Sequence, residues 1–496
     1  MKKRLTILFS AIALCFSMAM ASAILPADVN NDGIVSTEDA TLIYNFICGT
    51  ADVSITADMV DVNSDGKVNT ADVLEVYLKL GEITPDFPYL TFSADETQTM
   101  TIKIKGTYTL DESLEYSVND GEWAQLTTSP ITFGGNNGTL RLRGKSATGM
   151  ATDFTKYAQI TFGSKTVPVS CSGDIRTLVD YTNYSSTNTD EARFCYLFNG
   201  CSNLTSAPEL PADALAERCY YGMFYGCTGL TTPPALPATT LKGSCYYSMF
   251  YGCTELTTTP SLSADTLSDM CYYNMFYGCT SLTTAHNLPA TTLAKSCYAN
   301  MFYGCTSLTT APALPATTLE ANCYEKMFYC CSSLAIAPAL PATTLAEKCY
   351  YYMFRDCTGL TEASTLPATT LEKSCYEYMF YGCTSLAISP TILATTLAEK
   401  CCYGMFYNCT NLTTSPTLLS TTLTEKCYYY MFRGCSNLNS ITMLATDISA
   451  SGCLSNWVDR VATTGTFFKS AEIEESAFSK DKNGIPNGWT IEDYNN

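Results

Sequence analysis

Between Cys195 and Cys453 the chain repeats one pattern of apolar and polar positions every 26 residues. One copy begins at Cys297 with Cys-Tyr-Ala-Asn-Met-Phe-Tyr-Gly-Cys-Thr-Ser-Leu and continues through a threonine- and proline-rich run to Leu319. A strict period of this size predicts stacked units, each of which buries its apolar side against its neighbours. We therefore predict that residues 195–453 form a solenoid of ten repeats.

The apolar positions within a repeat predict which side chains point inward. In one copy they are Leu236, Leu241, Cys245, Phe250, Cys253 and Leu256. Leu345, Cys349 and Met353 follow one another at helical spacing, which favours two to three helical turns around the first cysteine. The Leu-Thr-Thr-Ala stretch favours a short strand. The prolines that follow it, such as Pro312, cannot donate to a parallel ladder and limit that strand to about two to four residues.

A different pattern of apolar and polar residues precedes the repeats, over residues 87–163. Alternating apolar and polar runs are separated by turn signals such as Asn119-Asp120-Gly121. Six to eight short strands at this spacing predict a β-sandwich of the immunoglobulin-like sort, which we interpret as a spacer. A solenoid also needs atypical units at its ends. We assign these caps to residues 164–194 and 454–496.

The N-terminal residues 1–23 have the three parts of a secretory signal peptide. A basic start (Lys2, Lys3 and Arg4) precedes an apolar stretch that ends in the small residues Ala21-Ser22-Ala23. This order predicts export, with a secreted or cell-surface location. No other stretch approaches 18 consecutive apolar residues, so the sequence predicts no membrane span.

Residues 28–39 and 61–72 each fit a twelve-residue calcium loop with glycine at position 6. Calcium prefers oxygen ligands, and alternate residues of a curled loop supply them. The first loop offers Asp28, Asn30, Asp32, Ile34 through its carbonyl, Ser36 and Asp39. The second offers Asp61, Asn63, Asp65, Lys67 through its carbonyl, Asn69 and Asp72. Because two such loops occur in tandem, each followed by an apolar helical pattern, we predict two Ca²⁺ sites.

This arrangement over residues 24–82 resembles a type I dockerin, which has two loop–helix units with calcium at each. The resemblance implies docking to a cohesin-like or other scaffold protein. In that family positions 10 and 11 of each loop contact the partner. Here these positions hold Thr37, Glu38, Thr70 and Ala71. A calcium-stiffened spacer that binds no cohesin is the alternative interpretation.

The repeats resemble the BspA-type leucine-rich repeat surface proteins of host-associated bacteria. The matching core is Phe-x-x-Cys-x-x-Leu, as at Phe302, Cys305 and Leu308. The resemblance implies a secreted or surface-displayed binding protein, with an unknown protein or glycan ligand. The chain is then multidomain. It has a small all-α calcium-loop dockerin, an all-β sandwich-like module, and a leucine-rich-repeat-type solenoid with short parallel strands and short helices.

The 26 cysteines allow several interpretations. Export permits disulfides, but the Cys-x7-Cys spacing does not suit zinc. Because Cys253 and its equivalents occupy inward positions, we favour a buried, reduced ladder, with disulfides between repeats as the alternative. Cys48, on the apolar side of the first predicted helix, is expected to be buried and free.

Charge and composition favour binding over catalysis. A net charge of −19 repels nucleic acid and anionic membranes. Glycoside hydrolysis needs paired carboxylates in a cleft, and the repeats do not place carboxylates regularly on one face. We therefore predict no enzyme activity. The alternatives are a component of a polysaccharide-degrading assembly, whether glycan-binding or hydrolytic, and a purely structural stalk.

Tyrosine recurs at two positions of the repeat. One series follows the first cysteine, as at Tyr272 and Tyr298. The other follows the Met-Phe pair, at Tyr251, Tyr277, Tyr303 and Tyr329. Arginine replaces tyrosine in the second series at Arg355 and Arg433, which a buried position would not readily accept. We therefore predict that the second series is exposed and contacts a partner.

Overall fold

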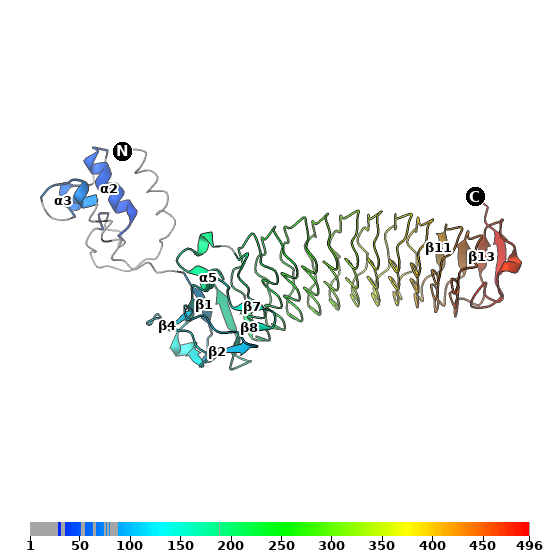
Figure 1. The fold of residues 1–496 in the computed structure, drawn as a ribbon, viewed down its shortest axis with the longest axis horizontal. Coiled ribbons are helices and arrows are strands. Elements are labelled where there is room, and N and C mark those ends of the chain that lie inside the picture. Colours follow the sequence, from blue (N-terminus) through cyan, green and yellow to red (C-terminus); the bar gives the residue numbers. More distant parts are fainter. Residues whose placement is uncertain are drawn as a thin grey trace. The chain divides into compact units, whose positions relative to one another are not determined.

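The computed structural model describes residues 28–30, 35–50, 55–62, 66–73, 76, 79, 88–187 and 189–495. The chain divides into two compact units, Met1–Phe87 and Pro88–Asn496. Figure 1 shows the helices of the first unit and the long stack of coils in the second. Residues 1–23, where we expect a signal peptide, lie outside the described residues.

Among its described residues, the first unit has a small core and the helices α2 and α3, and residues 70–73 are helical as well. Helix α2 (Thr37–Ile47) starts at a capping box formed by Ser36 and Asp39, and α3 (Ala57–Val60) follows it. The buried apolar side chains of this unit are Val29, Val35, Ala40, Ile43, Val60 and Val76.

The prediction that Cys48 is buried was wrong, because its side chain is exposed. Cys48 is the C-cap residue of α2, five positions after the buried Ile43. Five residues turn a helix by about 140° beyond one full turn, which directs Cys48 away from the apolar face.

The second unit begins with a sandwich of two sheets. One sheet has the order β10-β9-β1-β6-β3-β4, and the other has the order β5-β2-β8-β7. The first consists of β1 (Leu90–Ser93), β3 (Glu115–Val118), β4 (Ala124–Gln125), β6 (Leu140–Arg143), β9 (Val169–Ser172) and β10 (Leu204–Ser206). The second consists of β2 (Gln98–Lys105), β5 (Ile131–Phe133), β7 (Ala151–Asp153) and β8 (Lys156–Phe162). A 3-10 turn, η1 (Gly135–Asn137), precedes β6. Alternate side chains of β2 and β8 are buried, and Phe92 of β1 meets Phe162 of β8 across the sandwich at 6.0 Å between ring centroids.

Strand β9 joins the sandwich to the solenoid. It pairs antiparallel with β1 and parallel with β10, which belongs to the first coil of the repeats. The Phe92 ring also lies 6.2 Å from the Phe198 ring, so one apolar core runs from the sandwich into the repeats. Part of the segment that we expected to be only a cap is therefore also a strand of the sandwich.

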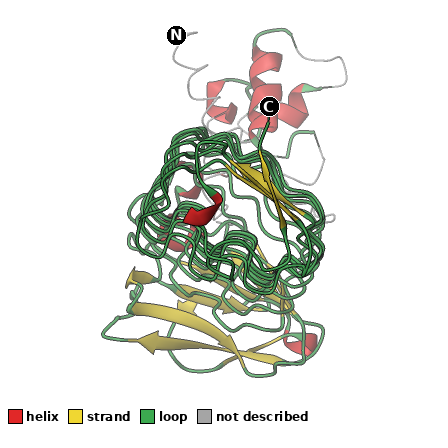
Figure 2. Ribbon diagram, turned by 90° about the vertical axis from the view of Figure 1, so that its right-hand side faces the viewer, coloured by secondary structure: helices red, strands yellow, loops and turns green. Residues whose placement is uncertain are grey.

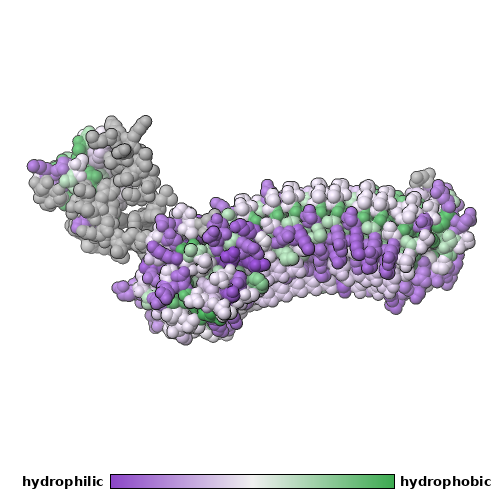
Figure 3. Space-filling view, viewed as in Figure 1, coloured by the Kyte–Doolittle hydropathy of each residue, from purple (hydrophilic) through white to green (hydrophobic). Residues whose placement is uncertain are grey.

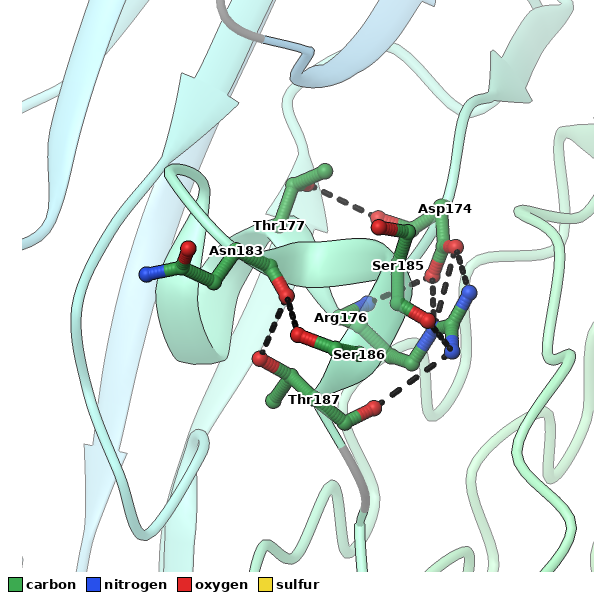
Figure 4. Close-up of polar contacts among 7 residues, drawn as sticks. All are labelled: Asp174, Arg176, Thr177, Asn183, Ser185, Ser186 and Thr187. Carbon is green, nitrogen blue, oxygen red and sulfur yellow. Dashed lines mark hydrogen bonds and ion pairs between the residues drawn. The ribbon is translucent and has the colours of Figure 1, made fainter. Parts of the chain in front are cut away.

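The rest of that segment is fixed by polar contacts around α5 (Thr177–Asp180) and η2 (Tyr184–Ser186). The Arg176 guanidinium donates through Nε and Nη2 to the Asp174 carboxylate, at 2.7–3.1 Å. Its Nη1 donates to the carbonyl oxygens of Ser185 and Thr187, so Arg176 closes the loop that follows α5 (Figure 4). The hydroxyls of Ser186 and Thr187 both donate to the Asn183 carbonyl.

The repeats form a solenoid whose coils lie almost on top of one another when viewed along the stack (Figure 2). Neighbouring coils meet in single parallel β-bridges, such as Thr266 with Thr292 and Thr318 with Thr344. Near the C-terminal end of the solenoid the bridges extend into a parallel sheet of β11 (Thr414–Leu418), β12 (Ser440–Met443), β13 (Thr466–Lys469) and β14 (Thr490–Asp493). The turn η3 (Glu475–Ala477) lies between the last two strands.

The predicted helical turns around the first cysteine were wrong. Residues 189–474, all of which the structure describes, contain no helix. In their place each repeat has a turn ribbon, the segment equivalent to 296–305. In this ribbon the N–H groups of Asn300 and Phe302 donate to the next coil, at Glu325 O (2.8 Å) and Met327 O (2.9 Å).

The N–H groups between these donors bond three residues back within the coil, as from Met301 to the Tyr298 carbonyl at 3.2 Å. Every fourth residue is left-handed, with φ of 53° at Ser296, 54° at Asn300 and 70° at Gly304. The ribbon therefore has a period of four, and half of its N–H groups join the coils together.

The inward positions were predicted correctly. Leu236, Leu241, Cys245, Phe250, Cys253 and Leu256 are all buried. The phenylalanines of successive coils stack in a column, with Phe302 lying 5.7 Å from Phe276 and 5.6 Å from Phe328 between ring centroids. Each coil is therefore covered by identical side chains on both sides, as expected of a solenoid.

Candidate functional site

Asp39, at position 12 of the first loop, is buried and holds the loop together. Its Oδ1 accepts from the backbone N–H of Val29 (2.7 Å) and of Asn30 (3.3 Å), and its Oδ2 accepts from Ser36 N–H (2.7 Å). Burial raises the pKa of the Asp39 carboxyl, these backbone donors lower it, and the neighbouring Asp28 carboxylate raises it further. A cation at this place would relieve the repulsion between the two carboxylates.

The second loop repeats this arrangement in its described part. Asp72, at position 12, is buried and accepts from Asn69 N–H at 2.9 Å. Asp61, at position 1, accepts from the N–H of Gly66, whose φ is +79°. The Asn69 side chain accepts from Ala71 N–H, as the Ser36 hydroxyl accepts from Glu38 N–H in the first loop.

These residues fit a calcium site by the chemistry of their donors. The described residues of the first loop, Asp28, Asn30, Ser36 and Asp39, offer oxygen donors, which calcium prefers. Asp32, Ile34, Asn63 and Asp65 lie outside the described residues. Within the described part, no three His, Cys, Asp or Glu side chains gather into a possible metal site.

The four predicted docking residues lie where a partner can reach them. Thr37 and Glu38 are the first two residues of α2, and Glu38 is exposed. Thr70 and Ala71, at the matching positions 10 and 11 of the second loop, are exposed as well.

On the solenoid, the second tyrosine series forms an exposed stack that we call the tyrosine column: Tyr225, Tyr251, Tyr277, Tyr303 and Tyr329. Successive rings lie 4.3–4.5 Å apart between centroids and are nearly parallel. Tyr225 is exposed, and the other four are half-buried. Each ring therefore covers the faces of its neighbours and leaves the rest of its surface partly exposed. Partial burial raises the pKa of Tyr277 and Tyr303, so their hydroxyls remain protonated donors.

The first tyrosine series is buried, as at Tyr272 and Tyr298, each only 1% exposed. The turn ribbon explains why one tyrosine series is buried and the other is not. Along the ribbon, two residues that point inward alternate with two that point outward. A third series was not predicted from the sequence: Tyr221, Tyr247 and Tyr273, whose rings stack at 4.5 and 4.8 Å. The same four-residue period would have revealed it, since these tyrosines precede those of the tyrosine column by four positions.

The 25 described cysteines are all free, and most of them are buried. The second cysteine of a repeat donates its S–H to the phenylalanine carbonyl 29 residues earlier, as from Cys305 to Phe276 at 3.1 Å. Burial raises the pKa of Cys279 to about 12, which keeps its thiol protonated and unreactive. Cys330 is the exception in the repeats, because it is partly exposed at a left-handed position that glycine occupies in several other coils.

Comparison with known families agrees with both resemblances. Residues 26–80 match the dockerin type I domain. Three overlapping segments, 194–308, 243–387 and 347–484, match the BspA type leucine rich repeat region and together span more than half of the chain. The chain belongs to the BspA-type leucine-rich repeat family. A search of curated proteins finds no match to it.

This BspA-type protein thus carries a type I dockerin domain ahead of its repeats. Type I dockerin domains bind calcium and engage cohesin-type scaffolds, and both kinds of module are non-catalytic binding modules. Proteins with these modules are typically extracellular or bound to a surface. Among the described residues, we see no helix with the length and apolar character that a membrane crossing requires.

Proposed function

We propose that this BspA-type protein is exported, docks to a cohesin-like scaffold through its calcium-loaded dockerin domain, and binds a protein or glycan partner along the tyrosine column. The observation that carries this proposal is the tyrosine column itself. Five aromatic side chains in successive coils stay partly exposed, although the same coils bury another tyrosine completely.

The dockerin domain supports the docking half of the proposal. Calcium would be held by Asp28, Asn30, Asp32, Ile34, Ser36 and Asp39 in the first loop. In the second loop the matching ligands would be Asp61, Asn63, Asp65, Lys67, Asn69 and Asp72. The ion supplies positive charge that offsets the repulsion among these carboxylates and holds the loops closed. Thr37 and Glu38 would then contact the scaffold from the start of α2, and Thr70 and Ala71 from the helical residues 70–73.

The tyrosine column supports the partner-binding half. Tyrosine combines apolar area with a hydroxyl and loses little side-chain freedom on binding, which suits it to interfaces. In this column the stack itself fixes the rings before any partner arrives, so binding would cost little ordering. Repetition of one contact in five coils would also add avidity for an extended partner.

The test compares variants of the intact exported protein by capture of its partners with and without calcium. Replacing Tyr277, Tyr303 and Tyr329 by phenylalanine keeps the stack but removes three hydroxyls, and replacement by serine removes the rings. We expect the phenylalanine variant to weaken capture by the solenoid and the serine variant to abolish it.

The matched control replaces the exposed threonines Thr257, Thr283 and Thr309 by alanine, in three successive coils but at another position of the repeat. Capture by this control should be unchanged. Calcium removal should release only the scaffold bound through the dockerin domain. Equal capture by the control and the serine variant would contradict partner binding at the tyrosine column.

A further inference from the structure

Arg355 takes the place of tyrosine in the coil that follows Tyr329. Its guanidinium carbon lies 5.2 Å from the Tyr329 ring centroid, 5.0 Å from that of Tyr352 and 4.3 Å from that of Tyr381. Its Nε donates to the Asp356 carboxylate at 3.2 Å. Three rings and one carboxylate therefore fix the orientation of this guanidinium.

Arg433, three coils further on, has a related arrangement with two rings instead of three and with an Nε that lies beside a carboxylate without a hydrogen bond to it. Its guanidinium carbon lies 4.8 Å from the Tyr430 ring centroid and 5.5 Å from that of Tyr407, and its Nε lies 3.1 Å from Asp459 Oδ2. The two arginine side chains are 28% and 24% exposed. Among the described residues, the terminal nitrogens of both arginines make no hydrogen bond, so each offers four N–H donors to a ligand.

A guanidinium that is held flat and keeps its terminal donors open matches the two oxygens of a carboxylate. Adjacent coils are about 4.8 Å apart, which places the two arginines roughly 14 Å from one another along the solenoid. The stacked rings of Tyr381 and Tyr407 lie between them, at 4.8 Å from each other. The surface thus alternates a cation, two neutral aromatic edges with hydroxyls, and a second cation.

We propose that Arg355 and Arg433 bind the carboxylates of an acidic polysaccharide in which uronate residues alternate with neutral sugars. Such a polymer carries negative groups separated by hydroxyl-bearing neutral sugars, and this surface carries two cations separated by tyrosine side chains. The assignment rests on the proposed function, because it extends the tyrosine column toward the C-terminal coils. It names the ligand of those coils and leaves the partner of Tyr251 to Tyr329 open.

Neighbouring charges weaken the attraction without removing it. Asp356 neutralises part of the Arg355 guanidinium, Asp459 is shared between Arg433 and Arg460, and the whole chain is acidic. Both carboxylates contact Nε, which leaves the terminal nitrogens for the ligand. Because attraction at the two arginines must overcome this general repulsion, binding is strongest when both contacts form together, and a single small carboxylate would bind weakly.

The experiment measures binding of hyaluronan, a polymer of this kind, to the full chain by isothermal titration calorimetry. Carboxyl-reduced hyaluronan, which keeps the sugar backbone but lacks the charge, is the ligand control, and poly-L-glutamate represents an acidic peptide. We expect hyaluronan to bind and the other two polymers to bind at least tenfold more weakly. Each of the variants Arg355→Gln and Arg433→Gln should lower the affinity roughly tenfold, since a hydrogen bond to a charged group is lost. The double variant should show no binding.

The matched control is Arg218→Gln, since Arg218 also lies over an aromatic ring (Phe154, 4.9 Å) but outside this series. It should bind hyaluronan as the parent does. The lysine variants Arg355→Lys and Arg433→Lys keep the charge but lack the paired N–H donors of the guanidinium group, and they should retain part of the affinity. This separates hydrogen bonding to a carboxylate from simple charge attraction. Unchanged binding by the double glutamine variant, or equal binding of reduced hyaluronan, would overturn the proposal. If poly-L-glutamate binds as tightly as hyaluronan and its binding depends on the two arginines, the ligand is an acidic peptide and not a glycan. If these tests fail while capture still depends on Tyr277, Tyr303 and Tyr329, the proposed function stands and only this assignment falls.

Discussion

The dockerin domain and the repeats hold their backbones in place by different means. The described dockerin buries six apolar side chains and fixes its first loop through the Asp39 carboxylate, which accepts three backbone N–H groups. The repeats bury apolar side chains in every coil and send half of the ribbon N–H groups to the next coil. The first region holds its loop through a buried carboxylate that lies near a second one, whereas each coil of the second region is held by its neighbours.

This difference also affects the surface that each region presents to solvent. Residues of like hydropathy form stripes along the solenoid surface (Figure 3), because each coil presents the same outward positions as the one before it. A repeated surface can therefore bind along its length without any single coil being essential. The described part of the dockerin has one small core instead of a repeated one, and we expect the loss of one loop carboxylate to affect this whole part.

Calcium removal should show the largest contrast between the two regions. With chelator, we expect the amide protons of α2 to exchange as in an unfolded segment, because repulsion among the loop carboxylates is no longer offset. Amides of the turn ribbons should keep their protection. Hydrogen exchange of the full chain with mass spectrometry measures both in one sample. Full protection of α2 in the presence of chelator would show that its small core suffices without the ion.

Within the repeats, Phe302→Ala should have the next largest effect. The ring is fully buried between Phe276 and Phe328, so its removal leaves a cavity under two neighbours. We expect a loss of about 3–5 kcal/mol in the free energy of unfolding, measured by denaturant titration. Tyr303→Ala, one residue away and half-buried, is the control and should cost clearly less. The stability of the dockerin domain should not change in either variant.

A smaller effect is expected from Cys305→Ala. It removes a buried S–H group that donates to the Phe276 carbonyl, and we expect a loss of about 1–2 kcal/mol. Because the thiols are free, reductant should leave the melting temperature of the parent protein unchanged. Maleimide should label the exposed Cys48 and the partly exposed Cys330 in the native protein, and the buried cysteines only after unfolding. A melting temperature that falls on reduction would show that the repeats are joined by disulfides.

Sequence reasoning succeeded where one residue's environment depends on its repeat position alone. The inward residues, such as Leu236 and Phe250, and the greater exposure of Tyr277 than of Tyr272 were predicted in this way. It failed for the ribbon, because Leu345, Cys349 and Met353 fit a helical period almost as well as a period of four. The left-handed residues that decide between them include Lys326 and Tyr352, whose types do not favour that conformation.

Pairing between strands far apart in the chain also could not be predicted from the sequence. Strand β9 belongs to the sandwich through β1 and to the solenoid through β10, and no local pattern records two partners so far apart in the chain. For the calcium loops, the motif named twelve ligands, and the structure describes Asp28, Asn30, Ser36 and Asp39 in the first loop and Asp61, Lys67, Asn69 and Asp72 in the second. The guanidinium sites at Arg355 and Arg433 were visible only as departures from tyrosine.

The smallest predicted effect is a change in the free energy of unfolding whose sign distinguishes the turn ribbon from a helix. Gly304 has φ of +70°, and a methyl group there would meet only the backbone of Gly278, at 3.9 Å or more. Gly304→Ala should therefore destabilise the repeats by about 1 kcal/mol through left-handed strain alone, without a steric clash. In a helix the same substitution would stabilise by about 1 kcal/mol, because alanine is the better helix former. Denaturant titration resolves this difference, and Gly252→Ala, the equivalent residue two coils earlier with φ of +69°, should give the same loss. A gain in stability at both positions would mean that these segments are helical after all.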